Sequence, residues 1–81
     1  MTAVLLVRYF AGARAAAGVP EEKVEAATLG ELVAVLTHDR PRLASVLTAC
    51  SFLVDGMSWR DREAALPATA TVDVLPPFAG G

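Results

Sequence analysis

The residues best suited to chemistry end the sequence, in the order Pro76-Pro77-Phe78-Ala79-Gly80-Gly81. Glycine lacks a Cβ atom, so a pair of glycines can enter a narrow channel in another protein. A terminal glycine also leaves its carboxyl carbon unhindered for attack once that group is activated. The two prolines remove backbone donors and favour an extended, stiff segment. We therefore expect Gly81 to carry a reactive carboxylate and the five residues before it to insert into a partner, with Phe78 as the anchor. The alternative is a frayed end without function.

Other residue types that often do chemistry have ordinary structural interpretations here. Cys50 lies in an apolar context, which favours a small buried hydrophobe over a nucleophile, because reactive thiols need an electropositive, accessible setting. His38, next to Asp39, is interpreted as a solvated charge at a helix end; one His and one Cys do not make a zinc site, so we expect no metal. Glu21-Glu22 and residues 60–63 are interpreted as solvated surface.

Length and composition indicate one small domain. The chain has 81 residues, of which 54% are hydrophobic and 20% charged, and this excludes a disordered tail. Seven Lys and Arg against nine Asp and Glu give a formal charge of -2, without the basic excess of a nucleic-acid-binding protein. The single Cys excludes an internal disulfide and fits a reducing compartment. No apolar run reaches transmembrane length and no basic signal peptide begins the chain, so we expect no membrane partner and a cytoplasmic location.

The first half of the chain predicts two strands with a short helical turn between them. Residues 4–10 are apolar and partly β-branched, with Leu5, Val7 and Tyr9 on one face of the strand and Arg8 on the other, less buried face. Residues 11–18 are helix-permissive and end in glycine. Residues 21–26 alternate weakly and are rich in charge, which is typical of an edge strand.

The main helix is predicted from a capping box and an apolar stripe. The Thr28 hydroxyl can accept a hydrogen bond from the backbone N–H of Glu31, whose carboxylate can reach back to the Thr28 amide. Pro41 breaks this helix and opens a second, short one. The apolar stripe of the main helix consists of Leu29, Leu32, Val33 and Leu36.

The second half of the chain completes the predicted sheet. Residues 51–54 form a strand, Asp55-Gly56 is a hairpin turn, residues 57–66 are irregular, and residues 71–75 alternate as the final strand. These elements favour an α+β fold, in which one main helix covers one face of a mixed sheet.

Nearly the whole chain resembles the ubiquitin-like sulfur carriers of the β-grasp fold. Among them it is most similar to the small subunit of molybdopterin synthase (MoaD) and less so to the shorter thiamine sulfur carrier (ThiS). Asp55, residues 67–70 and Phe78 depart from the usual pattern, and these departures bear on the pathway rather than on carrier function. The resemblance rests on Val7-Arg8-Tyr9-Phe10-Ala11 with Arg14 and Gly18, on residues 28–36, and on Leu75-Pro76-Pro77-Phe78-Ala79-Gly80-Gly81.

The resemblance implies a carrier without an active site of its own, with a β-grasp domain over residues 1–75 and a flexible tail over residues 76–81. An E1-like adenylating enzyme would use ATP and magnesium to activate the Gly81 carboxylate, and a persulfide donor would convert it to a thiocarboxylate. The tail would then enter the large subunit of molybdopterin synthase, where sulfur passes to a cyclic pyranopterin. No cofactor would be bound by the carrier itself.

The resemblance also implies a second site, on the face of the sheet away from the helix. In a β-grasp sheet the first and last strands are parallel neighbours, so Arg8 and Asp73 would pair across them. Leu6, Phe10 and Leu75 would share that face, and an apolar patch rimmed by charge is typical of a surface that docks a protein partner. The alternative is that Phe10 and Leu75 are covered by a loop.

Three other functions stay open on the sequence. The chain could carry sulfur for thiamine or cysteine synthesis, it could be a ubiquitin-like modifier conjugated through Gly81 to lysines, or it could be a non-covalent interaction module. Isopeptide adducts would indicate the modifier, and indifference to truncation of the tail would indicate the module.

Overall fold

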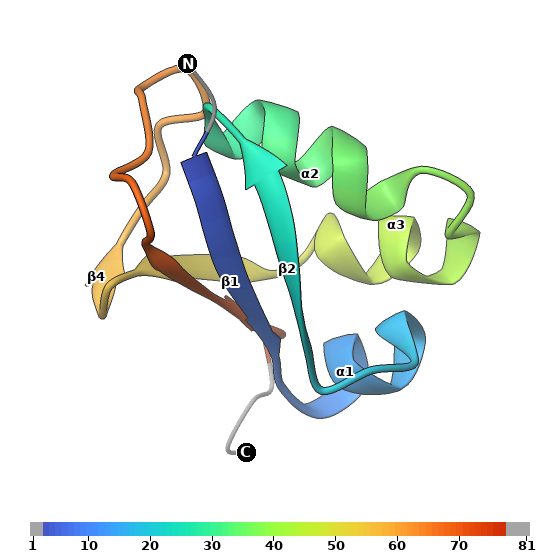
Figure 1. Ribbon diagram of the computed structural model, residues 1–81. Coiled ribbons are helices and arrows are strands. Elements are labelled where there is room, and N and C mark those ends of the chain that lie inside the picture. Colours follow the sequence, from blue (N-terminus) through green and yellow to red (C-terminus); the bar gives the residue numbers. More distant parts are fainter. Residues whose placement is uncertain (1–2, 78–81) are drawn as a thin grey trace.

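The computed structural model describes residues 3–77. A five-stranded sheet carries three helices on one side. Figure 1 shows α2 and α3 beside each other, and α1 at the C-terminal end of β1. The strand order is β2-β1-β5-β3-β4, with β1 and β5 parallel and every other neighbouring pair antiparallel. The elements are β1 (Ala3–Tyr9), α1 (Ala11–Ala17), β2 (Glu21–Ala26), α2 (Leu29–Thr37), α3 (Pro41–Leu47), β3 (Ser51–Val54), β4 (Met57–Ser58) and β5 (Thr71–Leu75).

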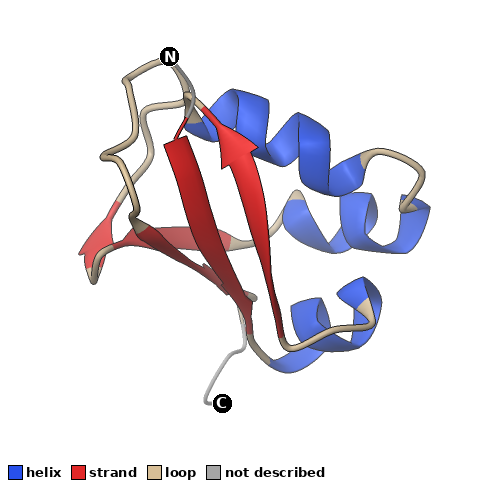
Figure 2. Cartoon of the chain, viewed as in Figure 1, coloured by secondary structure: helices blue, strands red, loops and turns tan. Residues whose placement is uncertain are grey.

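The mixed α+β arrangement confirms the fold class predicted from the sequence. The predicted strands and helices are present within a residue or two of their expected bounds. The helices cover a single face of the sheet (Figure 2), and the core fills the space between these two layers. Along β1 the burial alternates residue by residue, as its two-residue pattern predicts. The largest fully buried side chains are Leu5, Val7, Leu29, Leu32, Leu36, Leu43, Val72 and Val74.

Local turn chemistry explains where these elements end. Gly18 stops α1 in the left-handed region, with φ 81°, and its N–H donates to the carbonyl of Arg14. Asp55 and Gly56 both have positive φ, at 49° and 84°, which gives the tight hairpin between β3 and β4. The Thr28 hydroxyl caps α2 by accepting from the Glu31 N–H at 3.1 Å.

Two local expectations were wrong. The Glu31 carboxylate accepts from the amide of Ala27 at 3.2 Å, one residue before the predicted amide of Thr28. The stretch after the hairpin is not wholly irregular, because Met57 and Ser58 form β4 against β3. A strand of two residues is too short to show an alternating pattern, and the hairpin alone positions it. Among residues 3–77, no helix is long and apolar enough to cross a membrane.

A polar cluster on the helical side corrects the interpretation of Glu22 as solvated surface. The buried Tyr9 donates its hydroxyl to Glu22 at 2.6 Å, and the Arg40 guanidinium donates to both Glu22 oxygens at 2.7 and 3.2 Å. Glu22 therefore ties β1 and β2 to the connection between α2 and α3. Glu21, its neighbour in β2, is exposed, as expected.

The cluster makes a pH dependence of stability predictable. Hydrogen bonds from Arg40 and Tyr9 outweigh burial and lower the pKa of Glu22 below its ordinary value of 4.5. Folding therefore favours the ionised carboxylate. Its contribution is complete above the ordinary pKa and is lost as the pH falls through the lower folded-state value. We expect Arg40→Gln to lower the free energy of unfolding at neutral pH, and we expect its difference from the unaltered protein to become smaller in acid. Urea unfolding across a pH series measures this difference. The same experiment on Arg42→Gln, an exposed residue of α3, is the control, and a pH-independent deficit for Arg40→Gln would contradict the assignment.

Candidate functional site

An ion pair lies on the face of the sheet that no helix covers. Arg8 and Asp73 are direct neighbours across the parallel strands β1 and β5. The Arg8 guanidinium donates to both oxygens of Asp73, at 2.7 Å from Nε and 2.9 Å from a terminal nitrogen. The Asp73 side chain is 12% exposed and that of Arg8 46%, so the arginine covers a nearly buried carboxylate. The predicted pair is present in the bidentate geometry that gives strong, oriented hydrogen bonds.

Phe10 extends this pair toward the end of the strand. Its ring lies under the Arg8 guanidinium, with 5.8 Å from the guanidinium carbon to the ring centroid, which is within the range of a cation–π contact. The hydrogen bond and charge of Asp73 raise the pKa of Arg8, so the arginine stays charged. Phe10 is 38% exposed, so its ring is not covered by a loop in the described residues.

The apolar residues around the pair are more extensive than the sequence indicated. Leu6 and Leu75 are half-buried, and Val4 is 48% exposed. Val4 belongs to this face because it lies two residues before Leu6, and Leu53 belongs to it because it faces Asp73 across β3 and β5. The two-residue period of their strands could have placed both residues on this face from the sequence. We call this surface the outer face; it consists of Val4, Leu6, Arg8, Phe10, Leu53, Asp73 and Leu75.

The outer face leads directly to the predicted tail. The end of β5 is held on both sides, because Leu75 pairs with Ser51 of β3 and the Phe10 N–H donates to the Val74 carbonyl at 3.3 Å. Pro76 is half-buried and Pro77 is exposed, so the chain leaves the sheet at the edge of the outer face. The predictions for Phe78, Ala79, Gly80 and Gly81, and with them the division into a domain and a tail, lie outside the described residues.

Cys50 and His38 have the structural roles expected for them. Cys50 is half-buried, its thiol lies 3.2 Å from the Val46 carbonyl oxygen, and burial raises the pKa of the thiol, which disfavours the nucleophilic thiolate. His38 is exposed at the end of α2, 3.2 Å from a carboxylate oxygen of Asp39. Within residues 3–77, no three His, Cys, Asp or Glu side chains gather as a metal site would need.

Comparisons with known proteins agree with this geometry. Among solved structures, the chain is similar to small archaeal modifier protein 1 from Methanosarcina acetivorans (24% identity, TM-score 0.85, covering 100% of this chain and 99% of the other). It is also similar to a putative molybdopterin converting factor subunit 1 from Pyrococcus furiosus (23% identity, TM-score 0.82, covering 94% of this chain and 99% of the other). A third similar chain comes from a complex of subunits 1 and 2 of the molybdopterin-converting factor of Helicobacter pylori (23% identity, TM-score 0.76, covering 96% of this chain and 99% of the other).

Because these sequence identities are low, the structural matches establish the fold alone. No curated protein sequence matches the chain. The ThiS family model, in contrast, matches residues 7–81, which include the end of β1, most of the outer face and the glycine pair. The chain therefore belongs to the ThiS family and has the fold of its ubiquitin-like sulfur carriers.

Proposed function

We propose that this protein is a sulfur carrier and the small subunit of a molybdopterin synthase. Its Gly81 carboxylate is activated, converted to a thiocarboxylate and used to donate sulfur to a cyclic pyranopterin. The family match through residue 81 carries the proposal, since it joins the β-grasp body to the Gly80-Gly81 ending. The structural similarity to two chains named as molybdopterin converting factor subunits supports this pathway.

The proposed chemistry takes place in partner enzymes that act on the tail. In an adenylating enzyme, the Gly81 carboxylate attacks the α-phosphorus of ATP with the help of magnesium, and pyrophosphate leaves. The terminal sulfur of a persulfide then attacks the acyl carbon, and AMP leaves. A second thiol reduces the resulting acyl disulfide, which releases the thiocarboxylate and a new disulfide. This chain supplies the carboxylate and its placement, and binds no cofactor of its own.

The outer face is the proposed docking surface for these partners. It combines exposed Val4 and Phe10 with a rigid, charged Arg8, and aromatic and arginine side chains are enriched at protein interfaces. Its position at the exit of β5 lets one partner hold the body and receive the tail at the same time. The Helicobacter pylori complex, which holds subunits 1 and 2 together, supports a large-subunit partner.

Replacement of Phe10 by Asp tests this surface. We expect the affinity for the large subunit to fall by at least about tenfold, because a desolvated aromatic contact is lost and a charge must be buried. Calorimetric titration measures the effect, and Val35→Asp, which changes a somewhat more exposed apolar residue on α2, is the control. Unchanged affinity, or global unfolding of Phe10→Asp in circular dichroism, would contradict the docking role.

The modifier is the second candidate, because small archaeal modifier protein 1 is among the similar structures. Both functions start from the same activated Gly81, and they diverge in the nucleophile that attacks it. Sulfur gives the thiocarboxylate, and a lysine amine gives an isopeptide bond. Isopeptide adducts on cellular proteins, identified by mass spectrometry, would favour the modifier.

Reconstitution tests the proposed pathway. The thiocarboxylated protein, a molybdopterin synthase large subunit and the cyclic pyranopterin are combined, and dithiolene formation is followed by fluorescence of its oxidised product. We expect product formation in proportion to the thiocarboxylate consumed. Sulfur transfer to a thiazole or cysteine precursor instead, with none to the pyranopterin, would reassign the pathway and leave the carrier chemistry in place.

A further inference from the structure

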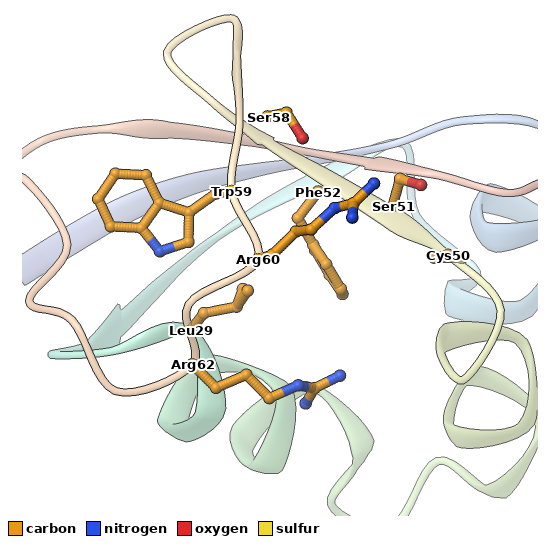
Figure 3. Close-up of a pocket in the computed structure, with 8 residues that line it drawn as sticks. All are labelled: Leu29, Cys50, Ser51, Phe52, Ser58, Trp59, Arg60 and Arg62. Atoms are coloured by element: carbon orange, nitrogen blue, oxygen red, sulfur yellow. The ribbon is translucent and has the colours of Figure 1, made fainter.

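A cavity of about 350 Å³ lies on the helical side of the sheet, between β3, the start of α2 and the loop that follows β4 (Figure 3). Its volume is at the lower end of the range for small-molecule sites. Leu29 and Phe52, both buried, and the half-buried Trp59 form its apolar lining. Ser51 and Ser58 of the neighbouring strands also line it. Neither Pro76 nor Pro77 lines it, so it is separate from the proposed tail site.

Two arginines give the cavity a concentrated positive charge. Figure 3 shows Arg60 and Arg62 extending from the loop to the same side. Within residues 3–77 neither forms an ion pair with a carboxylate, whereas Arg8 and Arg40 are each held by one. Asp61, which lies between them, is engaged elsewhere, because one of its oxygens accepts from the backbone N–H groups of residues 63 and 64. In a chain of net charge -2, two free guanidinium groups at one cavity favour an anionic ligand.

Hydrogen bonds fix the backbone of the loop that carries these arginines. The Trp59 N–H donates to the Phe52 carbonyl at 3.0 Å, and the Trp59 indole donates to the Asp61 carbonyl at 2.9 Å. The Gly30 N–H donates to the Arg62 carbonyl at 3.0 Å. Gly30 permits that approach, because a Cβ there would lie 3.1 Å from the same carbonyl oxygen. A loop fixed at these points orders little on binding, which lowers the entropic cost of capturing a ligand.

We propose that this cavity binds a small organic oxyanion, a phosphate or carboxylate joined to a short apolar body. Arg60 and Arg62 hold the oxyanion, and the apolar lining of Leu29, Phe52 and Trp59 receives the apolar part. Guanidinium groups match the geometry of both phosphate and carboxylate, and the mixed lining favours a ligand with two unlike ends. This site is independent of the sulfur chemistry proposed for Gly81, and the two proposals are tested separately.

Two single-copy residues report on the cavity. Trp59 is the only tryptophan of the chain and Cys50 its only cysteine, and both line the site. Phenyl phosphate is the probe, with inorganic phosphate to separate the oxyanion from the apolar body and sodium chloride at matched ionic strength as the salt control. Tryptophan fluorescence gives the binding curve. The rate of Cys50 alkylation at mildly alkaline pH shows how far a bound ligand protects the thiol.

We expect a saturable fluorescence change and slower alkylation with phenyl phosphate, and weaker binding of inorganic phosphate. Arg60→Gln and Arg62→Gln each weaken binding about tenfold, the usual loss for one hydrogen bond to a charged group. Arg42→Gln, at an exposed arginine outside the cavity, leaves binding unchanged. Because all three side chains are exposed, the variants keep the fold, which circular dichroism checks. A response that does not saturate, that chloride reproduces, or that survives in Arg60→Gln and Arg62→Gln would overturn the proposal.

Discussion

Deletion of Gly81 is expected to abolish sulfur loading, and so is the addition of one alanine after it. In the deletion the carboxylate recedes by one residue, and in the extension a Cβ atom stands beside the acyl carbon. Either change misplaces the reacting group, and misplacement by about 1 Å already costs on the order of a hundredfold in rate. Pyrophosphate exchange with the adenylating enzyme measures the activation step, and intact mass measures the sulfur product.

The same two variants separate chemistry from folding. The described core cluster is built from residues between Ala3 and Val74, so neither change alters a residue of that core. We therefore expect the thermal unfolding midpoint to stay at that of the unmodified chain. Sulfur loading of the extended variant at the normal rate would refute the role of Gly81, and a large loss of stability would place the tail within the folded domain.

Truncation of Leu32 to alanine is expected to cause the largest loss of stability. Leu32 is completely buried in α2, within the core cluster between the helices and the sheet. Truncation of a buried leucine leaves a cavity that the neighbours fill only in part, and costs about 2–5 kcal/mol. A domain this small has a total stability of only about 5–15 kcal/mol, so the variant is expected to be partly unfolded near body temperature.

Val35→Ala is the matched control for this truncation. Val35 lies on the same helix but is 46% exposed, so its loss removes little buried area, and we expect a change within about 0.5 kcal/mol. Urea denaturation measures the unfolding free energy of both variants. Equal effects at the two positions would mean that α2 does not pack against the sheet through Leu32.

The arrangement of the central strands and of the outer face was largely predictable. The two-residue period of β1 separates Leu5, Val7 and Tyr9 from Arg8, and the structure buries the first three and exposes the fourth. The Arg8–Asp73 pair followed once the first and last strands were expected to be parallel neighbours. These features depend on residues within one element and on one topological expectation.

Other features were out of reach because they depend on segments far apart in the chain. Glu22 looks like surface in its own strand, and only the approach of Arg40 from the connection between the helices shows why it is half-buried. The charged loop around Arg60 and Arg62 was correctly expected to be exposed. Its close passage over Gly30 and the cavity beneath it arise from tertiary contacts without a local pattern.

The most direct test of the central claim is the intact mass of the unaltered protein after incubation with an adenylating enzyme, ATP, magnesium, a persulfide donor and a thiol reductant. We expect a mass gain equal to the exchange of one oxygen for sulfur, located by fragmentation at Gly81 and dependent on ATP. No gain, with the same enzyme active on a known carrier, would contradict it.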